Sequence, residues 1–146
     1  VLVTSLGAGN PYEAHERIDL GTGLYCETVM RRRESLQVSD ARSDPDWAHN
    51  PDVKLGMISY LGVPLLWPDD SIFGTVCVLD RKSRNYDAKT LRLLQALKAL
   101  IEDDFRLIDA GQSTPPERYG PHWQAFERCL AELKAERLTG ACSPPY

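Results

Sequence analysis

The fold of this chain is decided by three short blocks of sequence: GLYCETV at Gly23–Val29, LGMISYLGVP at Leu55–Pro64 and FGTVCVLD at Phe73–Asp80. The first block follows a glycine-rich turn and carries apolar residues at helical spacing, which predicts a helix from about residue 23 to 32. The other two are apolar and flank a Trp-Pro-Asp-Asp turn, which predicts a β-hairpin with strands at 60–66 and 72–79. We expect the second strand of the hairpin to be buried on both faces at its centre.

Shorter elements surround these blocks. β-branched and apolar residues predict strands at 1–5 and 35–38. The segment from Asp40 to Asp52 is crowded with Asp, Asn, Ser and Pro, which hold turns by bonding their own backbone. A long irregular segment of this kind inside a compact domain is typical of a functional region.

A long helix is predicted from Asp87, its N-cap, to about residue 110. Its apolar residues form two neighbouring stripes: Leu91, Leu94, Leu97, Ile101, Phe105 and Ile108 in one, and Leu93, Leu100 and Leu107 in the other. Together they are wider than the roughly 100° face that a single sheet would bury. We therefore expect one side to pack on the sheet and the other to meet another helix. Alternatively, the second stripe covers a helix of the domain itself.

Composition excludes several classes of protein. The formal net charge of −4 argues against a surface for nucleic acid or for an anionic membrane, and no apolar run is long enough to span a bilayer. The four cysteines fit no zinc or haem-attachment spacing. We expect Cys26 and Cys77 to be buried as small apolar side chains. Free cysteines indicate a reducing compartment, and so a cytoplasmic protein.

The sequence predicts no catalytic residues and no metal site. Its histidines, at positions 15, 49 and 122, lie in three segments of different character, with no pair at helical spacing. His49 with Asp46 and Asp52 could bind a cation, but a turn-rich loop commonly produces such a cluster by composition alone. A glycine-rich phosphate loop and a nucleophile elbow are both missing from the sequence. The cofactor, if there is one, is unknown.

In their order and spacing, the three blocks resemble the GAF domains of bacterial signal-transduction proteins, over roughly residues 1–109. The resemblance implies an α+β fold, related to PAS domains, with a central antiparallel sheet flanked by helices. The family ordinarily has a helix and a further strand before the strand at Val1, so the domain is expected to be N-terminally incomplete. We expect a GAF domain at 1–110, a linker at 111–120, and a C-terminal helix and tail at 121–146.

Residue type and position suggest roles for four residues, independently of the resemblance. Glu27 can anchor the backbone of a neighbouring loop or bond a ligand, and we favour the anchor. Trp47, in its polar segment, can be the lid of a pocket or a pin that holds the loop to the core. Met57 and Tyr60 can line a cavity, although core packing is the simpler role for Met57. The resemblance implies a pocket between the sheet and the 40–57 segment, lined by Glu27, Trp47, Met57, Tyr60 and Cys77.

The resemblance implies a sensory or regulatory domain that is not itself an enzyme. An unidentified small molecule would bind in the pocket, and the helix at 87–110 would transmit the change to an output domain, a kinase or a cyclic-dinucleotide enzyme, in a homodimer. No cysteine is followed by histidine, which disfavours a covalent tetrapyrrole, and the cyclic-nucleotide signature of the family is missing.

Two alternatives stay open. The first is a thiol-dependent reductase of the free methionine sulfoxide type, for which Cys26 and Cys77 are the candidate thiols. The 40–57 segment contains no cysteine, which departs from that enzyme. The second is a dimerisation module that binds no ligand.

Overall fold

A three-stranded antiparallel sheet, in the order β3-β4-β5, forms the centre of the molecule in the computed structural model, which describes residues 2–3, 11–12, 16–111, 124, 128–129 and 131. The strands are β3 (Leu36–Val38), β4 (Ser59–Leu66) and β5 (Ile72–Asp80). The β4–β5 hairpin closes through a turn in which the Trp67 amide donates to the Ser71 carbonyl at 2.9 Å. The predicted hairpin and the predicted strand at 35–38 are therefore confirmed.

The prediction that the second hairpin strand is buried on both faces at its centre was wrong. Seven of the eight residues of β4 are buried, whereas the residues of β5 are half-buried or exposed. The reason is their place in the sheet: β4 lies between two strands, while β5 is an edge strand within the described part of the chain. Pro64 is tolerated in β4 because pairing with β3 ends at Gly62, where Leu36 lies opposite.

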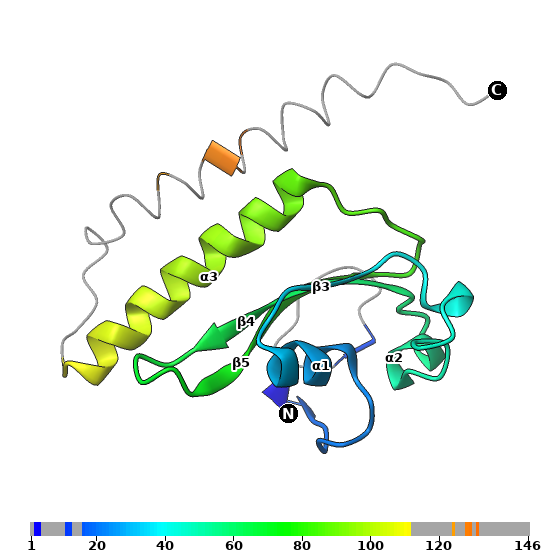
Figure 1. The fold of residues 1–146 in the computed structure, drawn as a ribbon, viewed down its shortest axis with the longest axis horizontal. Coiled ribbons are helices and arrows are strands. Elements are labelled where there is room, and N and C mark those ends of the chain that lie inside the picture. Colours follow the sequence, from blue (N-terminus) through cyan, green and yellow to red (C-terminus); the bar gives the residue numbers. More distant parts are fainter. Residues whose placement is uncertain are drawn as a thin grey trace.

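Helix α1 (Tyr25–Arg32) lies against one face of the sheet, as Figure 1 shows. It begins after Gly21 and Gly23, both with φ of +88°, and ends at Arg33, which takes the left-handed conformation. Tyr25 and Val29, four residues apart on one side of the helix, are fully buried. The predicted helix is thus confirmed to within two residues.

The segment predicted to be irregular contains a 3-10 helix, η1 (Ala41–Ser43), and a single turn of helix, α2 (Pro51–Lys54). Asn50 caps α2 by accepting from the Asp52 amide at 2.8 Å, and its own amide nitrogen donates to the Gly23 carbonyl at 2.8 Å. These bonds hold the segment against the start of α1.

Helix α3 (Ala88–Asp109) covers the opposite face of the sheet (Figure 1). Its predicted N-cap is confirmed, because the Asp87 carboxylate accepts from the Thr90 amide at 2.8 Å. Leu94 packs with Leu61 and Val63 on the α3 side of β4, whereas Tyr60 faces α1. A short ladder of β1 (Leu2–Val3) and β2 (Glu16–Arg17) completes the elements. Residues 112–120 of the linker predicted at 111–120, and most of the helix predicted after it, lie outside the described residues.

Candidate ligand-binding site

Three aromatic rings meet between α1 and the sheet. The ring of Tyr25 is stacked on that of Tyr60, with centroids 4.9 Å apart, and is tilted against Trp47 at 5.3 Å. Tyr25 comes from α1, Tyr60 from β4, and Trp47 from the segment between η1 and α2. We call these three residues the aromatic cluster. Around it pack residues from the sheet and from the 40–57 segment: Val29, Leu36, Val38, Ala41, Val53, Cys77 and Leu79.

The hydroxyl of Tyr60 is the unsatisfied group of this cluster. Tyr60 is 1% exposed, and its hydroxyl oxygen is buried without a hydrogen-bond partner among the described residues. The side chains of Thr75 and Cys77 lie close enough to influence it, although burial is the main reason that the pKa of Tyr60 is raised far above its ordinary value. A buried polar group left unpaired costs about 1–3 kcal/mol. A ligand that forms a hydrogen bond with this hydroxyl would remove that cost.

Cys26 and Cys77 belong to the same neighbourhood. Both are half-buried, so the prediction that they are buried overstated their enclosure. Burial raises the pKa of the Cys77 thiol to about 12, and the nearby Cys26 adds to the effect. Burial also raises the pKa of Cys26 itself. Both thiols are therefore held protonated at neutral pH, which disfavours thiolate chemistry in this conformation.

A buried carboxyl group, Asp52, flanks the cluster, although no sequence pattern predicted a role for it there. Asp52 is 6% exposed, and the Tyr12 hydroxyl donates to one of its oxygens at 2.6 Å. Burial raises the pKa of Asp52, and the bond from Tyr12 partly offsets this. The carbonyl of Asp52 also accepts from the Met57 amide at 2.9 Å, so Asp52 organises the approach to β4. No local pattern signals a pair that lies 40 residues apart in the chain.

Glu27 lies on the outer side of α1, at the loop that leads into the helix. Its carboxylate accepts from the amides of Gly21 and Thr22, each at 3.1 Å. Partial burial alone would raise the pKa of Glu27, but these amides outweigh it and hold the pKa below its ordinary value. The structure therefore gives Glu27 the anchoring contacts that we favoured.

Of the five residues predicted to line a pocket, the structure brings three into one assembly: Trp47, Tyr60 and Cys77. Met57 is buried and contributes its carbonyl, which accepts from the Tyr25 hydroxyl at 3.2 Å. Glu27 acts on the adjacent loop instead. Tyr25, the ring at the centre of the cluster, was missed as a site residue, although its position in the GLYCETV block on the buried face of a helix could have indicated it. Among the described residues, no group of three or more potential ligands could hold a metal ion.

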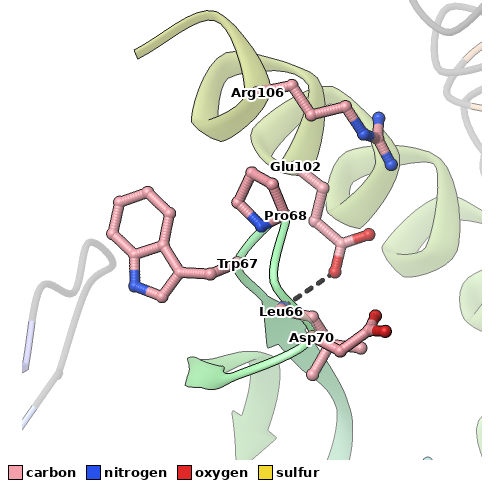
Figure 2. Close-up of a pocket in the computed structure, with 6 residues that line it drawn as sticks. All are labelled: Leu66, Trp67, Pro68, Asp70, Glu102 and Arg106. Atoms are coloured by element: carbon pink, nitrogen blue, oxygen red, sulfur yellow. Dashed lines mark hydrogen bonds between the residues drawn. The ribbon is translucent and has the colours of Figure 1, made fainter. Parts of the chain in front are cut away.

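A separate hollow of about 110 Å³ lies on the other side of the sheet, at the hairpin turn (Figure 2). Its lining comes from the turn and from α3: Leu66, Trp67, Pro68, Asp70, Glu102 and Arg106. The Glu102 carboxylate accepts from the Leu66 amide at 2.8 Å, which is the dashed line in Figure 2, and pairs with Lys98. Trp67 packs on Phe105 with centroids 4.4 Å apart. These contacts fix the turn to α3, so we assign the hollow a structural role.

Comparison with known proteins places the chain in a family. The sequence profile of the GAF domain matches residues 2–102, so this chain belongs to the GAF family. The antiparallel sheet with helices on both faces is the α+β fold that the resemblance implied. No protein with a curated description matches the sequence. Within the described residues, no helix is long and apolar enough to cross a membrane.

Solved structures with a similar fold include a GAF domain from a phosphoenolpyruvate-protein phosphotransferase of Acinetobacter, with a TM-score of 0.52 and 17% identity over 70% of this chain and 60% of that one. They also include fRMsr of Staphylococcus aureus in its reduced form, with a TM-score of 0.49 and 24% identity over 66% of this chain. The chain spans 58% of that protein's length. A further structure shows fRMsr in complex with its substrate, at 22% identity.

The prediction that the domain is not an enzyme is corrected by these neighbours. fRMsr is a methionine sulfoxide reductase with the GAF fold, so the fold does not separate binding domains from catalytic ones. The earlier inference relied on the resemblance to sensory members of the family. At these levels of identity, the neighbours show the fold alone.

Proposed function

We propose that this chain is a sensory or regulatory GAF domain that binds a small molecule at the aromatic cluster between α1 and the sheet. The observation that carries the proposal is the Tyr60 hydroxyl, which is buried without a partner beside two stacked or tilted rings. Apolar walls with a few convergent polar groups are the usual composition of a small-molecule site. The ligand class that fits is a flat molecule with one group able to hydrogen-bond to a phenol.

The residues proposed to contact the ligand are Trp47, Met57, Tyr60 and Cys77, with Glu27 positioning the loop that begins α1. Trp47 is half-buried and belongs to a segment that is tied down at Asn50 and Asp52. Movement of Trp47 away from Tyr25 would uncover the Tyr25 ring, which is stacked on Tyr60, without breaking the sheet. The 40–57 segment would therefore act as the cover of the site.

The output would pass through β4 to α3. Tyr60 and Leu61 are neighbours on β4 and face opposite sides of the sheet. A shift of β4 caused by the ligand would therefore move Leu61 and alter its packing against Leu94 of α3. A ligand moves such an equilibrium only by its difference in affinity for the two states, typically worth about 1–3 kcal/mol. We propose that the recipient is a kinase or cyclic-dinucleotide output domain of a cytoplasmic bacterial signalling protein, which works as a homodimer.

A thermal-shift screen with a small-molecule metabolite library tests the site. Any compound that stabilises the wild-type chain is expected to lose its effect with Trp47→Ala and to be weakened by Tyr60→Phe. Tyr86→Phe is the matched control, because it removes a hydroxyl that bonds Ser59 at 3.2 Å and packs on the α3 side of the sheet. Equal stabilisation of all three variants would show that the compound binds elsewhere.

A thiol-dependent reductase is the second candidate, favoured by the shared neighbourhood of Cys26 and Cys77. Reduction of a sulfoxide to a thioether by two thiols would yield a disulfide and water, so both cysteines would be required. The raised pKa values of the two thiols oppose this chemistry in the present conformation. Turnover of free methionine sulfoxide that is lost with Cys77→Ser would establish it, and turnover that persists in that variant would remove it.

A further inference from the structure

Asp52 is a buried carboxyl group without a positively charged partner among the described residues. It is 6% exposed, and none of the ion pairs in the described part of the chain involves it. Burial raises the pKa of Asp52, the Tyr12 hydroxyl lowers it, and no cationic side chain of the described residues contributes. A buried carboxylate costs stability unless an opposite charge compensates it. The fold therefore contains a carboxyl group whose negative charge these residues do not neutralise.

This carboxyl group belongs to the residue that adjoins one end of the Tyr25 ring. The Tyr25 hydroxyl donates to the Met57 carbonyl at 3.2 Å, and the Met57 amide donates to the Asp52 carbonyl at 2.9 Å. Burial is the main reason that the pKa of Tyr25 is raised, and the charge of Asp52 is the next. The hydroxyl end of the ring is thus linked through Met57 to Asp52, and the negative potential of the carboxylate reaches it.

The aromatic cluster favours a positive charge for an independent reason. The face of an aromatic ring is negative and attracts a cation that lies over it, by about 0.5–2 kcal/mol. Tyr25 and Tyr60 are 0% and 1% exposed, whereas Trp47 is the half-buried member of the cluster. The ring that Trp47 covers is therefore Tyr25, the ring closest in bonding to Asp52.

Negative charge is disfavoured in the same neighbourhood. Burial is the first cause of the raised pKa of the Cys26 thiol, and the charge of Asp52 is the second. Asp52 also contributes to the raised pKa of the Cys77 thiol, after burial and Cys26. Groups near the cluster are thus kept neutral in part by Asp52, and a ligand that carries a negative charge would meet the same repulsion.

We propose that the ligand of this site is a flat organic cation, such as a protonated amino- or amidino-substituted aromatic ring, whose charge pairs with Asp52. Its plane lies against the Tyr25 ring in the position that Trp47 now covers. Its N–H groups are hydrogen-bond donors, which both the Asp52 carboxylate and the unpaired Tyr60 hydroxyl oxygen can accept. This inference rests on the proposed function and adds the charge of the ligand to it. Asp52 is then a specificity-determining residue, because the ligand supplies the opposite charge that the described residues lack.

Three probes of similar size and shape test the charge on the unmodified chain. Benzamidine is a cation at neutral pH, benzamide is neutral and benzoate is an anion, and all three are flat. Titrations followed by NMR chemical shifts give the three affinities. We expect benzamidine to bind at least about tenfold more tightly than benzamide, and benzoate to bind more weakly than either. Benzamide that binds as tightly as benzamidine, or benzamidine that does not bind, would overturn the proposal.

Asp52→Asn removes the charge and keeps the shape of the side chain. In this variant the preference for benzamidine over benzamide should fall below about twofold. Asp69→Asn is the matched control, because it removes an exposed carboxylate at the hairpin turn and should leave the preference unchanged. A preference that persists in Asp52→Asn, or that falls equally in Asp69→Asn, would overturn the proposal.

The same titrations separate this inference from the proposed function. Equal binding of benzamidine and benzamide, weakened for both by Trp47→Ala, would overturn the charge preference and leave the aromatic cluster as the site. Binding of benzamidine that requires Asp52 but is unchanged in Trp47→Ala and Tyr60→Phe would contradict both, because the cation would then bind away from the rings.

Discussion

The side chain of Tyr60 occupies the space that any side chain at Gly62 would need. A Cβ atom at Gly62 would lie 2.1 Å from the Tyr60 hydroxyl oxygen and 2.5 Å from the ring carbon that bears it. The ring runs along β4 over Gly62 and stacks on Tyr25. The aromatic cluster therefore requires glycine at position 62, because the absence of a side chain lets the Tyr60 ring lie flat on the strand.

Gly62→Ala is expected to displace the Tyr60 ring and to destabilise the fold by about 1–3 kcal/mol, the usual cost of overpacking a well-filled core. The change in the free energy of unfolding can be measured by chemical denaturation. Gly74→Ala, on β5, is the matched control: a Cβ there meets no other atom within 4 Å and should cost little. Equal effects of the two substitutions would contradict the packing of Tyr60 over Gly62.

Glu27→Gln should loosen the loop before α1, because the ionised carboxylate accepts from two amides. We expect a loss of about 0.5–1.5 kcal/mol at neutral pH. Since the folded-state pKa of Glu27 is lowered, its contribution is present above the ordinary carboxyl pKa of about 4.3 and is lost as the pH falls through the folded-state value. Denaturation at several pH values should show the difference between wild type and variant shrinking in acid. A constant difference would argue against the role of the charge.

Asp52→Asn should show the opposite dependence on pH. The pKa of Asp52 is raised by burial, so its contribution to stability is complete below the unfolded-state pKa of about 3.9 and is lost as the pH rises through the folded-state value. The amide can still accept from Tyr12, so the variant should gain stability relative to wild type as the pH rises to neutral.

Asp69→Asn is the contrasting control for this experiment. The hydrogen bond from Ser71 lowers the pKa of Asp69, so the variant should be the less stable chain at neutral pH, and the difference should fade in acid. The same sign for both variants would contradict the burial of the Asp52 charge.

Asp87→Ala should remove the N-cap of α3 and cost about 1 kcal/mol. The Asp87 carboxylate accepts from both the amide and the hydroxyl of Thr90, each at 2.8 Å. Asp87→Asn keeps an acceptor and should recover most of the loss in a thermal denaturation. If alanine and asparagine behave alike, the cap does not stabilise the helix.

Local patterns were enough to predict most of the architecture. The glycines before α1, the turn at Trp67 and the cap at Asp87 are local signals, and the structure confirms each element they predicted. The predicted burial of the second hairpin strand was wrong because burial depends on the order of the strands in the sheet. The apolar run of β5 is compatible with a central or an edge strand, and only the pairing of β4 with both neighbours decides between them.

The candidate site was predicted only in part for a similar reason. Trp47 and Tyr60 are distinctive side chains in segments that the fold brings together. The Tyr12–Asp52 bond joins residues 40 positions apart, and the unpaired state of the Tyr60 hydroxyl depends on the packing around it. Neither leaves a trace in the spacing of the sequence. Of the second stripe of α3, Leu100 is buried and Leu93 and Leu107 are half-buried, and what the stripe packs against stays a prediction.

Native mass spectrometry of the purified chain, beside its denatured mass, tests the central claim that a small molecule binds at the aromatic cluster. We predict that the wild-type protein carries an excess mass that disappears on denaturation, that Trp47→Ala purified in the same way carries much less of it, and that Tyr86→Phe retains it. A wild-type chain without excess mass, or an excess mass that Trp47→Ala retains in full, would contradict the account.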